Sequence, residues 1–114
     1  MVNEAEAAAE ELATTGIDAA VLDVRWLSPL DHGTVVDLSR KLRRVLVVHE
    51  ANLTGGYGAE VAARVAEQAF GELAAPVMRL TTPDVRMLAA PVLRDALLPS
   101  SSTIADAVRQ LVRA

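Results

Sequence analysis

The sequence predicts an α/β fold, a three-layer sandwich in which helices cover both faces of a mostly parallel sheet. Short aliphatic runs of strand length alternate along the chain with amphipathic stretches of helix length. Strands that alternate with helices are typical of parallel sheets with right-handed crossovers. The chain has 114 residues, of which 52% are hydrophobic, so it can bury the core of one domain. We therefore expect residues 1–114 to form a single α/β domain.

The N-terminal half contains two expected helix–strand pairs. Residues 4–14 are almost all strong helix formers, and Gly16 follows them at the usual position of a helix C-cap. The apolar run 19–24 predicts a short buried strand. A second helix is expected over 31–42, with an aspartate at its start as the cap. The aliphatic run 45–48 is bounded by charged residues and predicts the second strand.

The C-terminal half repeats this alternation. A helix is expected over 57–71 and a weaker strand over 76–80. Two prolines make 81–91 irregular, and a short helix over 93–98 ends at a third proline. The last helix is expected over 104–112, after a cluster of serine caps. The sequence therefore predicts three strands, which is few for this architecture, in a chain that starts on a helix.

Composition excludes several classes of function. The net charge is −4 and only 3% of the residues are aromatic, whereas nucleic-acid binding needs a basic face and usually stacking side chains. No apolar run approaches the roughly 18 residues that span a bilayer, and the acidic N-terminus does not resemble a signal peptide. We therefore expect no nucleic-acid or membrane partner and a cytoplasmic location. The chain has no cysteine, which excludes disulfides and thiolate chemistry.

The most informative local feature is a glycine-rich loop that opens a helix after a strand. His49 and Glu50 end the strand, and Gly55, Gly56 and Gly58 surround the start of the helix. Such loops lie at the carboxyl ends of parallel strands, where backbone amides can hold an anion. The pattern is neither a dinucleotide fingerprint nor a phosphate loop with its lysine. A tight turn with close helix–sheet packing is the favoured interpretation, and an anion site is the alternative.

The remaining polar residues give no catalytic set. His49 could serve as a base, but no second partner accompanies it in the sequence, and His32 is interpreted as an exposed residue of a helix start. The two histidines lack the spacing of metal ligands, and no Gly-x-Ser-x-Gly nucleophile motif is present. We therefore expect neither catalytic residues nor a metal site in this chain.

Several segments together resemble one family. Residues 22–31, Leu-Asp-Val-Arg-Trp-Leu-Ser-Pro-Leu-Asp, look like its signature Ile-Asp-Leu-Arg-Thr-Leu-x-Pro-Leu-Asp. Residues 47–51 and 55–60 resemble its next strand and glycine loop, and residues 75–84 and 98–100 match its closing segments in order and spacing. The family is the beta subunit of thiamine-diphosphate-dependent 2-oxo acid dehydrogenases, the pyruvate or branched-chain decarboxylase component. The matched region is its C-terminal, transketolase-C-like domain, and the resemblance covers essentially the whole chain.

Two departures from the family pattern stand out. The family's domain begins with a strand before the first helix, whereas Met1 and Val2 fall at the start of that helix, so the first strand is expected to be missing. After Asp84 the family continues with Thr-Pro-x-Pro and aromatics, but this chain has Val-Arg-Met-Leu-Ala-Ala. We expect altered contacts in that loop and, because a missing strand exposes a sheet edge, self-association.

The resemblance implies a part in assembly. In this family the coenzyme, thiamine diphosphate with Mg²⁺, lies between the alpha subunit and the beta subunit's N-terminal domain, so no cofactor residue carries over to this chain. The C-terminal domain resembles a module for subunit contacts and for docking to the lipoyl acyltransferase core. The candidate docking positions are Asp84 and the carboxylate of Ala114, with a turn-capping role for Asp84 as the alternative. The complete enzyme would oxidatively decarboxylate pyruvate or a branched-chain 2-oxo acid, and this chain alone is expected to be inactive.

Two alternative functions remain open at the level of sequence. The glycine loop after His49 also fits a free-standing, flavodoxin-like module that binds an anion or nucleotide. The corresponding domain of a transketolase or deoxyxylulose-phosphate synthase shares the fold. The run His-Glu-Ala at 49–51 and the run Leu-Ser-Pro-Leu-Asp at 27–31 favour the dehydrogenase branch.

Overall fold

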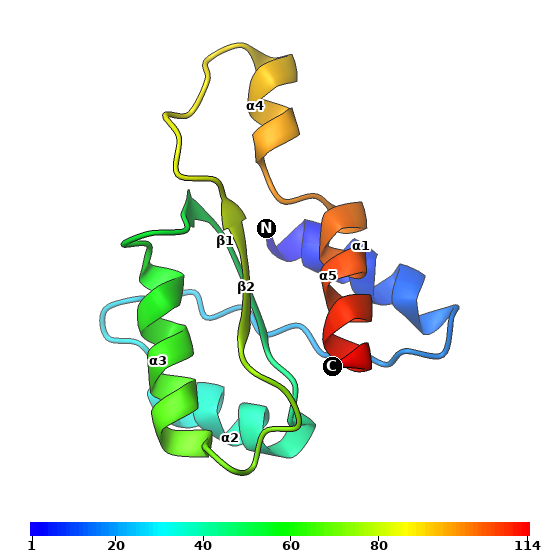
Figure 1. Cartoon of the computed structure of the whole chain (residues 1–114), viewed down its shortest axis with the longest axis vertical. Coiled ribbons are helices and arrows are strands. Elements are labelled where there is room, and N and C mark those ends of the chain that lie inside the picture. The colour runs from blue at the N-terminus through cyan, green and yellow to red at the C-terminus, as the bar shows by residue number, and fades with distance from the viewer.

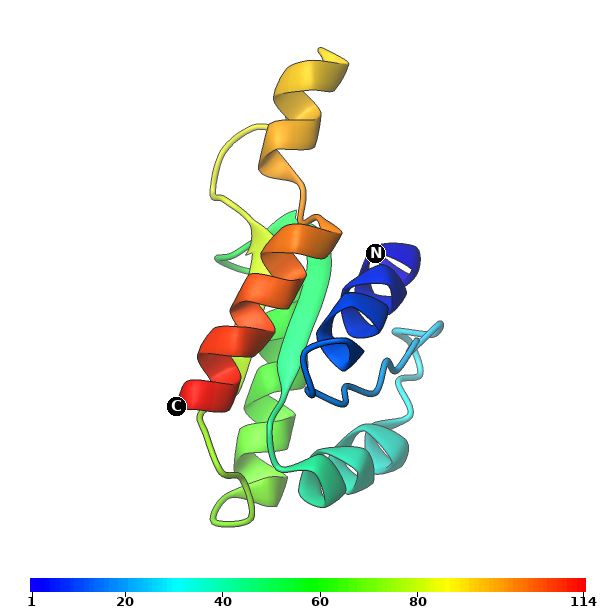
Figure 2. The ribbon, with the colours of Figure 1, turned by 90° about the vertical axis from the view of Figure 1, so that its right-hand side faces the viewer.

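A computed structural model describes all 114 residues and shows three layers (Figures 1 and 2). The elements are α1 (Val2–Ala13), α2 (His32–Leu42), β1 (Leu46–Asn52), α3 (Tyr57–Ala69), β2 (Met78–Thr82), α4 (Pro91–Leu97) and α5 (Ser101–Arg113). Helices α2 and α3 lie on one face of a parallel sheet and α1 and α5 on the other, while α4 projects away from the body (Figure 1). The predicted three-layer α/β architecture is confirmed. No helix is long and apolar enough to cross a membrane.

Local capping explains where α2 and α5 begin and where α2 ends. The Asp31 carboxylate accepts a hydrogen bond from the Thr34 N–H at 3.0 Å, and α2 ends at Arg43 in a left-handed conformation with φ of 66°. Ser100 and Thr103 form a reciprocal capping box at the start of α5. The aspartate and serine caps anticipated from the sequence are therefore present.

The sheet has two strands, not three. β1 pairs in parallel with β2, with Leu46 opposite Met78 and Val48 opposite Leu80. The prediction of a strand over residues 19–24 is wrong: this segment is extended but pairs with no strand. The segment forms no strand because it has no neighbouring strand to pair with: the backbone of residues 18–23 makes no hydrogen bond within the chain. A β-strand is defined by hydrogen bonds to a neighbouring strand, so an apolar composition alone does not make this segment a strand.

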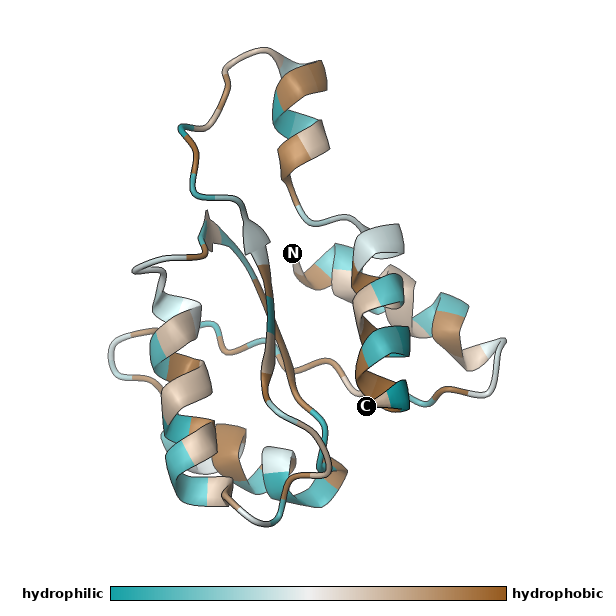
Figure 3. Ribbon diagram, viewed as in Figure 1, coloured by the Kyte–Doolittle hydropathy of each residue, from teal (hydrophilic) through white to brown (hydrophobic).

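Two separate apolar cores cover the two faces of the sheet. The first joins Val35 of α2 to Val61, Val65 and Ala69 of α3, with Val47 of β1 packed against them. The second joins α1 to α5 through these residues: Ala8, Leu12, Ile104 and Ala105, packed against Leu46, Val48 and Leu80. Neighbouring residues of β1 thus serve opposite cores, as strand geometry requires. Figure 3 shows the matching alternation of hydrophobic and hydrophilic bands along α3 and α5.

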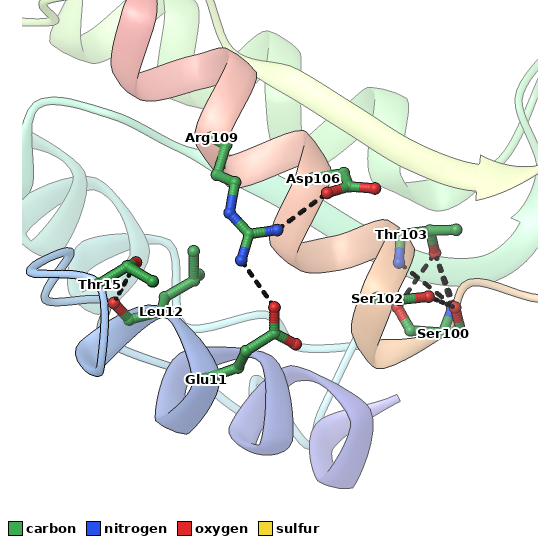
Figure 4. A network of polar contacts seen from close by, with 8 residues as sticks. All are labelled: Glu11, Leu12, Thr15, Ser100, Ser102, Thr103, Asp106 and Arg109. Carbon is green, nitrogen blue, oxygen red and sulfur yellow. Dashed lines mark hydrogen bonds and ion pairs between the residues drawn. The ribbon is translucent and has the colours of Figure 1, made fainter.

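Polar contacts tie α1 to α5 above their shared core. Arg109 donates to Glu11 at 2.6 Å and to Asp106 at 2.9 Å (Figure 4). The Glu4 carboxylate accepts from the Ser101 N–H at 2.7 Å, at the opposite end of the pair. The two helices therefore run side by side in the same direction, although about 90 residues separate them.

Replacing Leu12 should reveal how much the α1–α5 core contributes. Leu12 is 1% exposed, so Leu12→Ala should lower the free energy of unfolding by about 2–5 kcal/mol through lost burial and a cavity. Val92→Ala on α4 is the control, because Val92 is 82% exposed and its truncation should change stability by less than about 0.5 kcal/mol. Urea denaturation followed by circular dichroism measures both. Equal effects of the two substitutions would contradict this core.

Candidate functional site

The glycine loop is built around the ring of His49. His49 lies in β1, and its imidazole packs on the backbone of Gly58 at the start of α3. A methyl group on Gly58 would overlap the Nε2 atom, and one on Gly56 would overlap the Asn52 carbonyl oxygen and the His49 ring. Both glycines are therefore required by close approach of helix to strand. The packing interpretation of this loop accounts for Gly56 and Gly58 without a ligand.

His49 itself is half-buried and unusual in its bonding. Its Nε2 atom is buried and has no hydrogen-bond partner. Burial lowers the pKa of His49, and the positive charge of Arg79 lowers it further. The ring is therefore neutral at pH 7. The Glu50 side chain is exposed and makes no hydrogen bond or ion pair, so the structure does not join it to His49 as an acid–base pair.

Two further residues of the glycine loop, Gly55 and Tyr57, are held by turn geometry and by one long-range hydrogen bond, respectively. Gly55 has φ of 74°, a left-handed conformation that glycine adopts without strain, and open space surrounds its α-carbon. Tyr57 donates its hydroxyl hydrogen to the Leu27 carbonyl at 2.8 Å. This contact joins the start of α3 to the loop before α2. Sequence reasoning missed it, since nothing local marks Tyr57 as a partner of a residue 30 positions away.

Asp84 has a structural partner across the carboxyl end of the sheet. Its carboxylate accepts from the Thr54 N–H at 2.8 Å and from the Thr54 hydroxyl at 2.5 Å. These two hydrogen bonds lower the pKa of Asp84. Arg79 donates to the Leu53 carbonyl at 2.7 Å and strengthens the same junction. Asp84 thus fastens the loop after β1 to the segment after β2.

The second docking candidate, Ala114, lies at the other end of the molecule. Arg44 donates to the Leu111 carbonyl at 3.2 Å and to an oxygen of Ala114 at 3.5 Å. Arg44 precedes β1, whereas Thr54, the partner of Asp84, follows it. The structure therefore places Asp84 and Ala114 at opposite ends of the sheet and does not bring them into one surface.

The side chains present do not fit thiamine diphosphate with Mg²⁺. No group of three or more histidine and carboxylate side chains is close enough to hold a metal ion. The glycine loop that could have cradled a diphosphate is instead packed by His49. No step of a coenzyme reaction can be derived from residues of this chain.

Comparison with known proteins places this architecture in a family. The model of the transketolase C-terminal domain matches residues 1–104. The chain belongs to the transketolase C-terminal domain family. A solved structure described as a split gene transketolase, an inactive beta4 tetramer, superposes with a TM-score of 0.78 at 26% identity over 98% of this chain and 36% of that one.

The curated relatives of this transketolase C-terminal domain include several dehydrogenase beta subunits. The beta subunit of acetoin:2,6-dichlorophenolindophenol oxidoreductase from Cupriavidus necator is 38% identical over 99% of this chain. The pyruvate dehydrogenase E1 beta subunit of Rhizobium meliloti is 37% identical over 90%, and the 2-oxoisovalerate dehydrogenase beta subunit of Pseudomonas aeruginosa is 46% identical over 71%. The chain spans only 33%, 22% and 22% of their lengths, respectively. The resemblance to the C-terminal domain of such beta subunits is confirmed.

Adding a methyl group at Gly58 should separate α3 from β1. Gly58→Ala should lower the free energy of unfolding by about 1–3 kcal/mol, because the new methyl group would overlap the His49 ring and either the ring or α3 would have to shift. Gly33→Ala is a matched control at the second residue of α2, where the new methyl would meet only Asp31 Oδ1 at 3.6 Å. That control should be neutral or stabilise by up to about 1 kcal/mol. A Gly58→Ala protein as stable as the control would refute the packing role.

The lowered pKa of His49 has a direct consequence for stability. The folded chain resists protonation of His49, whereas the unfolded chain accepts a proton near the ordinary pKa of 6.5. The contribution of His49 to the free energy of unfolding is therefore fully present above pH 6.5. It is lost as the pH falls through the folded-state pKa. Nuclear magnetic resonance titration of the imidazole should give a lower midpoint in the folded chain than in urea. A folded midpoint at or above the urea value would contradict this burial.

Proposed function

We propose that this chain serves as an assembly module: the C-terminal domain of a beta subunit in a thiamine-diphosphate-dependent 2-oxo acid dehydrogenase. One observation carries the proposal. Relatives that match nearly the full chain are named as beta subunits of dehydrogenases or of an acetoin oxidoreductase. The molecule itself exposes several large apolar side chains, as a surface for contact with another subunit would, which fits a role in assembly.

In this proposal the chemistry belongs to the complete enzyme. That enzyme would oxidatively decarboxylate pyruvate or a branched-chain 2-oxo acid, with thiamine diphosphate and Mg²⁺ held by other parts of it. The relatives' names contain three different compounds: acetoin, pyruvate and 2-oxoisovalerate. All three relatives are nevertheless similar to this chain, at 37–46% identity. This variety supports the interpretation that the domain does not select the substrate.

The partners proposed are the alpha subunit and the lipoyl acyltransferase core, together with a second copy of the chain. The segment from Val85 through α4 carries several exposed large apolar residues, with Val92 82% exposed and Leu93 53% exposed. It stands clear of the body (Figure 1), as an element used for contacts between subunits would. Asp84, at the base of this segment, remains the proposed position for core docking, and Ala114 would act from the far end.

Two other functions have less support. A free-standing anion-binding module would need an open glycine loop, and His49 packs against that loop. The transketolase alternative shares the fold, but the transketolase structure is 26% identical to this chain, compared with 37% for the pyruvate dehydrogenase relative of Rhizobium meliloti. The dehydrogenase branch is therefore preferred.

A domain exchange tests the assembly role. The C-terminal domain of the Bacillus subtilis pyruvate dehydrogenase E1 beta subunit, a relative 43% identical over 84 residues, would be replaced by this chain. The chimera should assemble with its alpha subunit in size-exclusion chromatography, and Asp84→Ala should weaken capture by the immobilised acyltransferase core. Asp37→Ala, at an exposed position of α2, is the control. A folded chimera that never joins the alpha subunit would overturn the proposal.

The isolated chain supplies the complementary measurement. Calorimetric titration with thiamine diphosphate and Mg²⁺ should show no binding, because no side-chain set in the molecule fits them. Micromolar binding of thiamine diphosphate by the isolated chain would contradict the proposal that other parts of the complete enzyme hold the coenzyme.

A further inference from the structure

We propose that the apolar groove between α3 and the start of β2 is an interface for a second copy of this chain, in which Phe70 of each copy fills the groove of the other. Such a contact rests on the assembly role proposed above, in which a second copy is one of the partners. The groove has a volume of about 790 Å³, and Phe70 stands at its rim, 89% exposed. Its apolar lining residues are Ala59, Ala62, Ala63, Ala66, Leu73 and Val77.

Helix α3 carries apolar side chains on two faces. One face, which includes Val61 and Val65, is buried in the core that α3 shares with α2 and β1. The other face holds Phe70 and the alanines of the groove, and it lies roughly 100° further around the helix. No other segment passes over α3 and β2 on the side that faces the viewer in Figure 1. The second face is therefore an apolar surface that the chain itself leaves uncovered.

Phe70 is the feature that marks this surface as a contact. The chain has three aromatic residues, Trp26, Tyr57 and Phe70, and Phe70 is the most exposed of them. Its ring has no polar group that water could hydrate, so burial of the ring is strongly favourable. Aromatic side chains are enriched at protein interfaces, where a few buried anchors supply most of the affinity. We therefore expect the Phe70 ring to be buried by a partner.

The shape of the surface is complementary to itself. Phe70 ends α3, and Leu73 and Val77 lie in the short connection from α3 to β2, so the ring and this part of the groove are at the same level of the molecule. A twofold rotation about an axis along α3 exchanges the two sides of the surface and keeps that level. It therefore places Phe70 of each copy over Leu73 and Val77 of the other, as a twofold interface requires. The small alanine side chains let the two helices approach closely.

Charge favours a second copy over a different partner. The helical spacing places Glu60 and Glu67 along the edge of this face that points away from the sheet, whereas Arg79 of β2 lines the opposite edge. The same twofold rotation brings the acidic edge of each copy to the basic edge of the other. A partner with a single sign of charge would meet repulsion at one of the two edges.

Truncation of Phe70 tests the interface in the full chain. Analytical ultracentrifugation over a wide range of concentration should show an equilibrium between monomer and dimer. Phe70→Ala should raise the dissociation constant of the dimer by about a hundredfold, because each aromatic anchor is worth about tenfold and the twofold symmetry removes two of them. Val92→Ala on α4 is the matched control: Val92 is 82% exposed but lies outside the groove, so the constant should not change.

Disulfide cross-linking locates the contact. The chain has no cysteine, so a single introduced cysteine reports only its own contacts. Ala66→Cys should give a cross-linked dimer on mild oxidation, because an axis along α3 brings the two copies of this position together. Asp37→Cys, at an exposed position of α2, is the control and should remain monomeric. Phe70→Ala combined with Ala66→Cys should lower the cross-linked fraction.

Three results would overturn the interface. The first is a chain that stays monomeric at every concentration, and the second is equal cross-linking of Ala66→Cys and Asp37→Cys. The third is a dimer that tolerates Phe70→Ala but is lost in Leu22→Asp, which would place the contact at the open edge of β1 instead. All three measurements use this chain alone, whereas the domain exchange described above reports on the alpha subunit and the acyltransferase core. Failure of one proposal is therefore distinguishable from failure of the other.

Discussion

β1 is the constraint on which the rest of the molecule depends. Its side chains alternate between the two cores: Val47 packs against α2 and α3, while Leu46 and Val48 pack against α1 and α5. A strand covered by helices on both faces takes its backbone hydrogen bonds from neighbouring extended chain. β2 supplies them on one side. The other edge of β1 pairs with no strand, and residues 18–24 are extended without joining the sheet.

The carboxyl end of the sheet shows how a loop can resemble a ligand site and serve packing instead. Gly56 and Gly58 allow the His49 ring to lie against the first turn of α3, and burial keeps that ring neutral. Asp84 then fastens this corner through Thr54. The glycines of this loop pack against His49 and the Asp84 carboxylate is bonded to Thr54, whereas the Nε2 atom of His49 has no hydrogen-bond partner. The proposed role in assembly agrees with this use of polar residues.

Much of the fold could be predicted from the sequence because it is encoded locally. The helix formers at 4–14, the aspartate cap of α2 and the aliphatic run before His49 each act within a few residues. The prediction at 19–24 failed for the opposite reason. An apolar run specifies burial, but pairing depends on a neighbour that only the tertiary arrangement supplies or withholds. The Tyr57–Leu27 and Thr54–Asp84 contacts escaped prediction in the same way, since each joins residues 30 positions apart.

The sequence by itself determined the alternation of helices and strands, the small aliphatic core and the membership in a transketolase-C-like family. These properties depend on composition, periodicity and motif order, all of which can be read from the linear sequence. Only the tertiary structure decided what the polar residues singled out in the sequence do. It packed His49 against glycines, separated Asp84 from Ala114 by the length of the sheet, and left β1 with one open edge. The roles of these residues depend on contacts between segments that are far apart in the sequence, and no local sequence pattern predicts such contacts.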